Sequence, residues 1–136
     1  MNLIGAKARK ASDKKIDSKA KNKVLNDYVK LITKEKNVIL KENIKDIQFA
    51  KKKGLRENLI NRLFINENKL DNIKQSIQKI EKLNDPVNII LDKWKRPNGL
   101  NISRVTIPIG VIGVIYESRP NVTSDVASLC FKSGNS

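Results

Sequence analysis

A short polar segment after an apolar run holds the residues most suited to ligand chemistry. Glu117, Ser118, Arg119 and Asn121 follow the run Ile109–Tyr116 and come directly before a predicted helix. In open α/β sheets, ligands bind at the carboxyl ends of the strands, and a helix amino terminus favours an anion. These residues therefore indicate an anion-binding loop, although a capped loop that only contacts solvent explains their spacing equally well.

The other reactive residue types exclude several kinds of chemistry. The chain has no histidine, so a Ser-His triad and a histidine-containing metal site are excluded, and no metal site is expected. The one cysteine, Cys130, lies in the middle of the last predicted helix, where cysteine is usually a small buried apolar residue. A reactive thiolate favours a helix amino terminus or a nearby cation, so we interpret Cys130 as structural. Gly110 and Gly113 do not form a dinucleotide-binding motif, and glycines inside a strand usually serve packing.

The composition leaves a second class of function open. Basic residues outnumber acidic residues 28 to 14, and the net charge of +14 is compatible with binding nucleic acid or another polyanion. Most of the basic residues are lysines without neighbouring aromatics, whereas nucleic-acid sites use arginine forks and stacking rings. A solvated basic surface is therefore the preferred interpretation.

Three observations bear on the compartment. No apolar run approaches the roughly 20 residues of a membrane helix, the first residues have no signal-peptide core, and the single cysteine fits a reducing environment. The protein is expected to be soluble and cytoplasmic, without a membrane partner.

Helical patterns dominate the first half of the chain. A short helix is expected over 3–12 and a longer one over 18–42, in which apolar residues recur on one face, namely Val24, Tyr28, Leu31, Val38 and Ile39. A third helix should end at the lysines 51–53, because cations favour the carboxyl end of a helix and Gly54 suits a left-handed cap.

Two further helices are expected before the pattern changes. Leucines at every fourth position predict a short helix over 56–64. The clearest amphipathic helix spans 67–83, and its apolar stripe consists of Leu70, Ile73, Ile77, Ile80 and Leu83.

The pattern becomes strand-like after Asp85-Pro86, which ends the helices. Strands over 87–94 and 100–107 flank a turn at 96–99 and predict a β-hairpin. The continuous apolar run 109–116 predicts a strand buried on both faces, as in parallel sheets. A helix should follow, with Thr123 or Ser124 as its N-cap and a stop at Lys132-Ser133-Gly134-Asn135. A second parallel strand should come next, so the fold is expected to be cut.

The residues from Pro97 onward resemble the glutamate-5-semialdehyde dehydrogenase family, or gamma-glutamyl phosphate reductases, of the aldehyde dehydrogenase superfamily. The resemblance rests on Pro97-Asn98-Gly99-Leu100, on the run 108–123 with the sequence PIGVIGVIYESRPNVT, and on Leu129-Cys130 with Lys132-Ser133-Gly134-Asn135. Looser agreement reaches back through Asp85-Pro86-Val87 to the lysine-rich helices. The chain resembles an amino-terminal fragment of such an enzyme.

The resemblance implies an α/β, aldehyde dehydrogenase-like fold that is truncated within a Rossmann-like parallel sheet. Residues 1–84 would form a helical segment, and 85–108 a β-hairpin of the kind that serves oligomerisation. Residues 109–136 would be the first strand, loop and helix of the nucleotide-binding domain. The complete enzyme would be a homo-oligomer.

The resemblance also implies an activity. Such enzymes use NADPH to reduce L-glutamyl 5-phosphate to L-glutamate 5-semialdehyde and phosphate, a step of proline biosynthesis. Tyr116 and Glu117 would lie near the NADP cofactor, and Arg119 and Asn121 would face the substrate. The nucleophilic cysteine would lie beyond residue 136, so no catalytic residue is expected in this chain and the fragment should be inactive alone. A polyanion-binding module and a non-catalytic interaction fragment are the alternatives.

Overall fold

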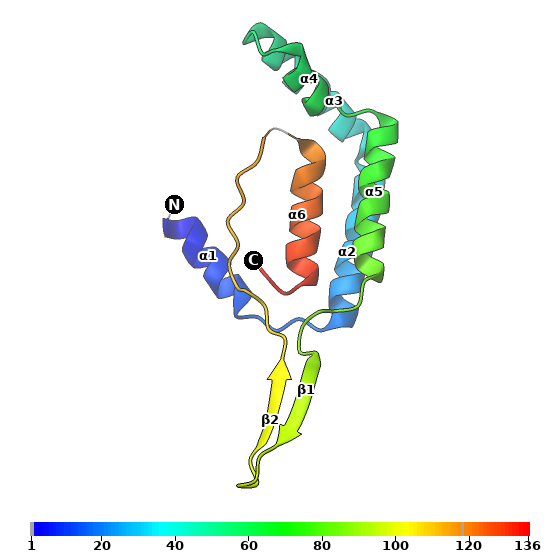
Figure 1. Cartoon of the computed structure of the whole chain (residues 1–136). Coiled ribbons are helices and arrows are strands. Elements are labelled where there is room, and N and C mark those ends of the chain that lie inside the picture. Colours follow the sequence, from blue (N-terminus) through cyan, green and yellow to red (C-terminus); the bar gives the residue numbers. More distant parts are fainter. Residues whose placement is uncertain (1, 118) are drawn as a thin grey trace.

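The computed structural model describes residues 2–117 and 119–136. The elements follow one another as α1 (Asn2–Ser12), α2 (Ser18–Lys34), α3 (Lys36–Lys52), α4 (Glu57–Leu63), α5 (Glu67–Lys82), β1 (Ile90–Lys95), β2 (Asn101–Val105) and α6 (Pro120–Lys132). Helices therefore come first, a hairpin follows and one helix ends the chain, as the sequence predicts (Figure 1). None of the described helices is long and apolar enough to cross a membrane.

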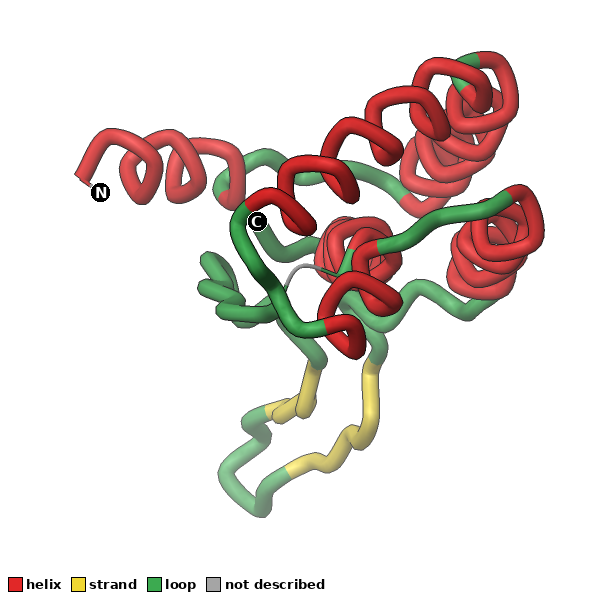
Figure 2. Tube along the Cα trace, turned by 90° about the horizontal axis from the view of Figure 1, so that it is seen from above, coloured by secondary structure: helices red, strands yellow, loops and turns green. Residues whose placement is uncertain are grey.

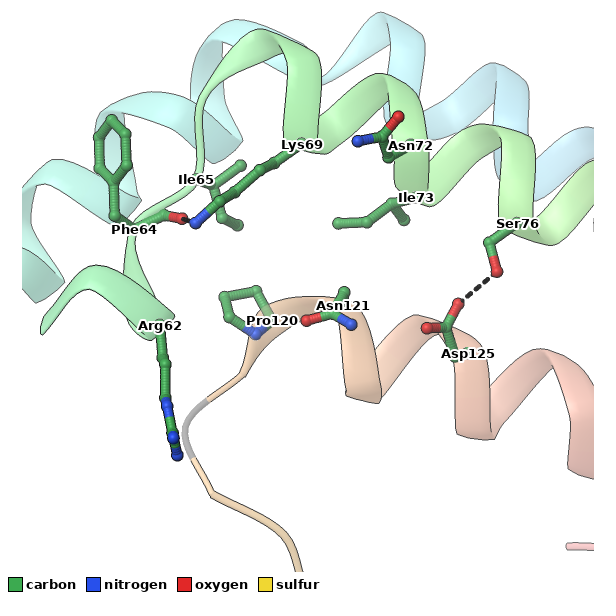
Figure 3. A pocket seen from close by; sticks show the side chains of 10 residues that line it. All are labelled: Arg62, Phe64, Ile65, Lys69, Asn72, Ile73, Ser76, Pro120, Asn121 and Asp125. Atoms are coloured by element: carbon green, nitrogen blue, oxygen red, sulfur yellow. Dashed lines mark hydrogen bonds between the residues drawn. The ribbon is translucent and has the colours of Figure 1, made fainter. Parts of the chain in front are cut away.

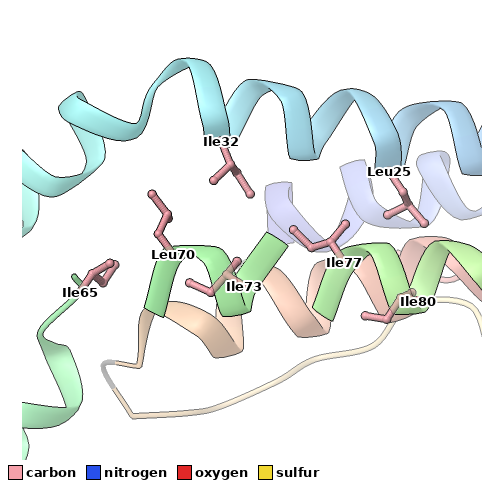
Figure 4. Packing of buried hydrophobic residues seen from close by; sticks show 7 residues of the cluster. All are labelled: Leu25, Ile32, Ile65, Leu70, Ile73, Ile77 and Ile80. Atoms are coloured by element: carbon pink, nitrogen blue, oxygen red, sulfur yellow. The ribbon is translucent and has the colours of Figure 1, made fainter. Parts of the chain in front are cut away.

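A single core joins three of the helices. Its seven buried residues come from α2, from α5 and from the turn before α5, namely Leu25, Ile32, Ile65, Leu70, Ile73, Ile77 and Ile80 (Figure 4). Phe131 of α6 packs against this cluster. The predicted stripe of α5 is confirmed except at Leu83, which is exposed because it caps the helix in an extended conformation. Burying side chains of this size contributes about 1.5 to 3 kcal/mol each, so the stripe holds α5 against α2 and α6.

The expected single helix over 18–42 is wrong. The chain turns at Glu35, which separates α2 from α3. Glutamate and lysine favour helices, so no local signal marks this break. Helix α3 leaves α2 there and packs against α4.

The predicted apolar face of this segment is also wrong in part. Val24, Leu31 and Val38 are each at least half exposed, whereas Leu25 and Ile32 are buried. The buried face is thus turned by one residue from the predicted one, because α2 is covered by both α5 and α6.

Helix α6 begins earlier than predicted. Pro120 stands at its first turn, where the missing N–H costs nothing, and neither Thr123 nor Ser124 is the cap. Ser124 and Ser128 are instead buried within the helix, and the Ser124 hydroxyl lies 3.1 Å from the Tyr28 hydroxyl of α2. Their small side chains allow α6 to lie close to α2.

The predicted hairpin is confirmed, and it stands away from the helices (Figure 2). Strands β1 and β2 pair antiparallel, from Ile90 opposite Val105 to Lys95 opposite Asn101. The turn closes where Arg96 donates to the Leu100 carbonyl and Gly99, at φ +88°, donates to the Arg96 carbonyl. Every residue of β1 is exposed, Trp94 included.

The predicted buried strand over 109–116 does not form. The segment is extended but belongs to no strand, and Ile109 and Ile115 are almost completely exposed. A strand requires hydrogen-bonded neighbours, and among the described residues the backbone of this segment pairs only with Ser136. The Ser136 N–H donates to the Gly110 carbonyl at 2.9 Å, and the Ile112 N–H donates to the Ser136 carbonyl at 2.7 Å. This alternation is that of a parallel pair, so the segment 109–116 has one parallel backbone contact, with Ser136.

The division into segments 1–84, 85–108 and 109–136 stays a prediction. The structure adds that α6, from the last segment, packs on α2 and α5 of the first.

Gly134 after α6 is expected to be the most sensitive glycine. It has φ +72°, and a Cβ there would lie 3.0 Å from Pro108 Cγ and 3.3 Å from Val87 Cγ2. Gly134→Ala should lower the free energy of unfolding by about 2 kcal/mol, through both backbone strain and crowding. Gly54→Ala is the matched control, because Gly54 has φ +70° but open space around it. If urea denaturation showed equal decreases in the free energy of unfolding for the two variants, crowding against Pro108 and Val87 would not contribute to the effect.

Candidate functional site

A cavity of about 300 Å³ lies between α5, the end of α4 and the start of α6 (Figure 3). Its floor is apolar, with buried Ile65 and Ile73. The remaining lining residues are Arg62, Phe64, Lys69, Asn72, Ser76, Pro120, Asn121 and Asp125. A volume of this size and an apolar floor with a few polar groups are typical of small-molecule sites.

One end of the cavity is cationic. The Lys69 ammonium donates to the Phe64 carbonyl at 2.8 Å and to the Asn61 carbonyl at 3.1 Å, and it lies 5.6 Å from the centre of the Phe64 ring. An ammonium has three donors, so one remains for a ligand. The Arg62 guanidinium forms an ion pair with Glu117 through Nη1, which ties the loop before α6 to α4.

The opposite end is anionic. The Ser76 hydroxyl donates to Oδ1 of Asp125 at 2.7 Å, across the gap between α5 and α6. Asn72 and Asn121 lie between the two ends (Figure 3). Among the described residues, neither of their side-chain amides has a hydrogen-bond partner, so both are available to a ligand.

The structure does not bring all of the predicted site residues together in the cavity. Asn121 lines the cavity. Arg119 precedes α6 as its N-cap residue, and its Nε is 3.7 Å from Oε2 of Glu117, the oxygen that Arg62 also contacts. The Tyr116 hydroxyl lies 2.8 Å from the Thr123 hydroxyl. Ser118 lies outside the described residues.

Sequence reasoning missed most of the cavity. Lys69, Asn72 and Ser76 occupy the polar face of α5, which a helical pattern assigns to solvent. The pattern around Asp125 indicates only a residue near the start of a helix. No signal in the sequence connects these positions, because α5 and α6 meet only in the tertiary structure.

A second polar cluster lies at the other end of the helices and is structural. The Lys21 side chain is 3% exposed, and its ammonium donates hydrogen bonds of 3.0 and 2.9 Å to the two oxygens of Asp85. Burial by itself raises the pKa of the Asp85 carboxyl. Hydrogen bonds from Lys21 and the Val87 N–H, with the charges of Lys21 and Lys132, outweigh this effect and hold that pKa below its ordinary value of 3.8.

Lys132 is held in the same region. It is buried and donates to Oδ1 of Asn22 at 2.6 Å and to the Glu81 carbonyl at 2.8 Å, which fixes α6 to α2 and α5. Cys130, close by in α6, is partly buried and does not line the cavity. Among the described residues, no group of three or more potential ligands gathers as a metal site.

Comparison with known proteins identifies relatives. No protein-family model matches the chain. The gamma-glutamyl phosphate reductase of a Nitratiruptor species is 60% identical over 77 residues, which are 57% of this chain and 19% of the relative. That of Syntrophomonas wolfei is 53% identical over 77 residues, 57% of this chain and 18% of the relative.

Solved structures extend the match to nearly the whole chain. The gamma-glutamyl phosphate reductase of Thermotoga maritima superposes with a TM-score of 0.93 and 38% identity, over 98% of this chain and 33% of that one. The Saccharomyces cerevisiae enzyme superposes with a TM-score of 0.92 and 32% identity, over 98% and 35%. The aldehyde dehydrogenase-like fold expected from the sequence is thus confirmed. The chain is homologous to gamma-glutamyl phosphate reductases, and its matched residues span about a fifth of the length of its curated relatives and a third of the solved structures.

Proposed function

We propose that this chain supplies the substrate-facing part of a gamma-glutamyl phosphate reductase. The reaction is the NADPH-dependent reduction of L-glutamyl 5-phosphate to L-glutamate 5-semialdehyde and phosphate, in proline biosynthesis. The observation that carries the proposal is the cavity that Asn121, from the most family-like segment, lines together with the cationic Lys69. The relatives are enzymes, and nothing in the described residues favours the polyanion-binding or interaction-fragment alternatives.

Asn121 and Arg119 have roles that their chemistry supports. The Asn121 amide is free to donate to the acyl oxygen as negative charge develops on it during attack. Arg119 borders the same loop, and its guanidinium suits a carboxylate or phosphate. Because Cys130 does not line the cavity, we assign the nucleophilic thiolate to a residue outside these 136.

Tyr116 and Glu117 are proposed to face the cofactor. They end the extended segment that follows the hairpin, and ligands of open α/β folds bind beyond the carboxyl ends of strands. Tyr116 is about half exposed, so its ring is available to a flat nicotinamide. Glu117 is also exposed, but its carboxylate is engaged by Arg62, which supports an additional role in positioning the loop. NADPH would supply the hydride.

The hairpin is proposed to serve assembly into a homo-oligomer. It stands apart from the core and exposes Ile90, Leu91, Trp94, Leu100 and Val105. Large apolar side chains gathered on one projecting element are typical of protein interfaces. The single cysteine suits the reducing cytoplasm, where we place the reaction.

A chimaera tests the proposed function. This chain would replace the matching segment of the Thermotoga maritima reductase, and the product is expected to reduce glutamyl phosphate with NADPH. Asn121→Ala in the chimaera should lower kcat by about 100-fold, the usual loss of one oxyanion donor. Asn68→Ala on α5 is the control, because Asn68 is exposed and does not line the cavity.

The chain alone is expected to show no turnover. An inactive chimaera that retains the Thermotoga fold, or equal effects of the two asparagine substitutions, would contradict the proposal.

A further inference from the structure

The cavity carries charges of opposite sign at its two ends. Arg62 and Lys69 lie at one end and Asp125 at the other, with the two asparagine amides between them (Figure 3). A site for a simple anion would not include a carboxylate, because a like charge in a partly enclosed site weakens binding. The arrangement suits a ligand that itself carries both an ammonium group and an anionic group.

The geometry of α5 sets the length of such a ligand. Lys69 and Ser76 lie seven positions apart on this helix, and at about 1.5 Å per residue their Cα atoms are roughly 10 Å apart along its axis. Ser76 marks the anionic end, since its hydroxyl holds Asp125. An extended amino acid with a charged group at the end of its side chain is of comparable length.

We propose that Asp125 is the specificity-determining residue that binds the α-ammonium group of an amino-acid substrate, while Lys69, assisted by Arg62, binds the anionic group at its far end. The inference rests on the proposed function and deepens it by dividing the cavity into two subsites.

The hydrogen bonds around Asp125 suit this role. Ser76 donates to Oδ1, and among the described residues Oδ2 has no hydrogen-bond partner, so it is left to accept from an ammonium. The residue is partly buried beside the apolar Ile73, where a charge-assisted hydrogen bond is stronger than in open water. A ligand without the ammonium would leave the carboxylate unpaired, which weakens its binding.

The cationic end is led by Lys69. Arg62 is paired with Glu117, whereas Lys69 donates to two backbone carbonyls and forms no ion pair among the described residues. Glu117 thereby acts as a positioning residue that holds Arg62 at the edge of the cavity.

Binding to the complete 136-residue chain tests the inference. L-Glutamate and glutarate share two carboxylates, but only glutamate has the ammonium group, so their dissociation constants would be compared by calorimetry and by amide chemical shifts. We expect glutamate to bind about tenfold more tightly, the effect of one charge-assisted hydrogen bond. Asp125→Asn keeps an acceptor for Ser76 and should abolish this preference, with no weakening of glutarate binding.

Two controls separate the subsites. Asp71→Asn removes an equal charge from the exposed surface of α5, where Asp71 pairs with Lys74, and should leave the preference intact. Arg62→Gln should raise the dissociation constants of glutamate and glutarate by the same factor. Equal binding of glutamate and glutarate by the unaltered chain, or a preference that survives Asp125→Asn, would overturn the inference.

The test of the two subsites and the test of the proposed function can fail independently of each other. An active chimaera whose KM for glutamyl phosphate is unchanged by Asp125→Asn would overturn the subsite assignment and leave the reductase activity standing. An inactive chimaera, with the glutamate preference of the chain intact, would refute the activity and keep the subsite.

Discussion

Ile77→Ala is expected to lower the free energy of unfolding by about 4 kcal/mol, the largest stability effect of any single core substitution. Ile77 of α5 is completely buried in the core cluster, where Leu25 and Ile32 come from α2 (Figure 4), and Phe131 of α6 packs against the same cluster. Removing three carbons there leaves a void that the surrounding helices fill only in part. Because a domain of this size is stable by only about 5 to 15 kcal/mol, the variant should unfold at much lower urea concentrations.

The measurement and its control follow from the structure. Far-ultraviolet circular dichroism reports on the helices, whereas the fluorescence of Trp94 reports on the exposed hairpin. Ile44→Ala makes the same chemical change at a position of α3 that is 55% exposed, and it should alter stability by less than about 0.5 kcal/mol. A similar loss for both variants would mean that the packing of α5 does not dominate stability.

Lys21→Met is expected to cost about 3 kcal/mol, the second largest effect. The substitution keeps most of the side-chain volume but leaves the Asp85 carboxylate without its main partner in a mostly buried position. Breaking such a pair is costly because one charge remains uncompensated. Replacing both partners by apolar residues, as in Lys21→Met with Asp85→Leu, should restore much of the loss.

The acid dependence provides an independent check. Since the folded-state pKa of Asp85 lies below 3.8, the ion pair stabilises the protein above that pH and its contribution is lost as the pH falls through the folded-state pKa. The difference between the unaltered chain and Lys21→Met should therefore shrink as the pH is lowered below 3.8. Lys30→Met is the control, because Lys30 and Asp27 are both exposed and such pairs contribute about 0 to 1 kcal/mol. A pH-independent difference would contradict the assigned role of the ion pair.

The sequence by itself determined the local elements and the relationship to the reductases. The stripe of α5, the turn at 96–99 and the lysine–glycine stops after α3 and α6 are local patterns, set by helix periodicity, turn chemistry and capping. They are correct to within a few residues because interactions between near neighbours decide them. The segment around Asn121 also carried the family resemblance that the relatives support.

Only the tertiary structure decided which residues share a site. The break at Glu35 and the rotated face of α2 follow from packing against α5 and α6, which the local sequence does not encode. The run 109–116 has the composition of a buried strand, but a strand depends on neighbours, and here it has one parallel contact at Ser136. Ser76 and Asp125 lie far apart along the chain and meet only because α5 and α6 pack together. The cavity with oppositely charged ends therefore could not be predicted from the sequence. Polar residues on two separate helices have the pattern of solvent-exposed surface, and only the packing of the helices brings them into one site.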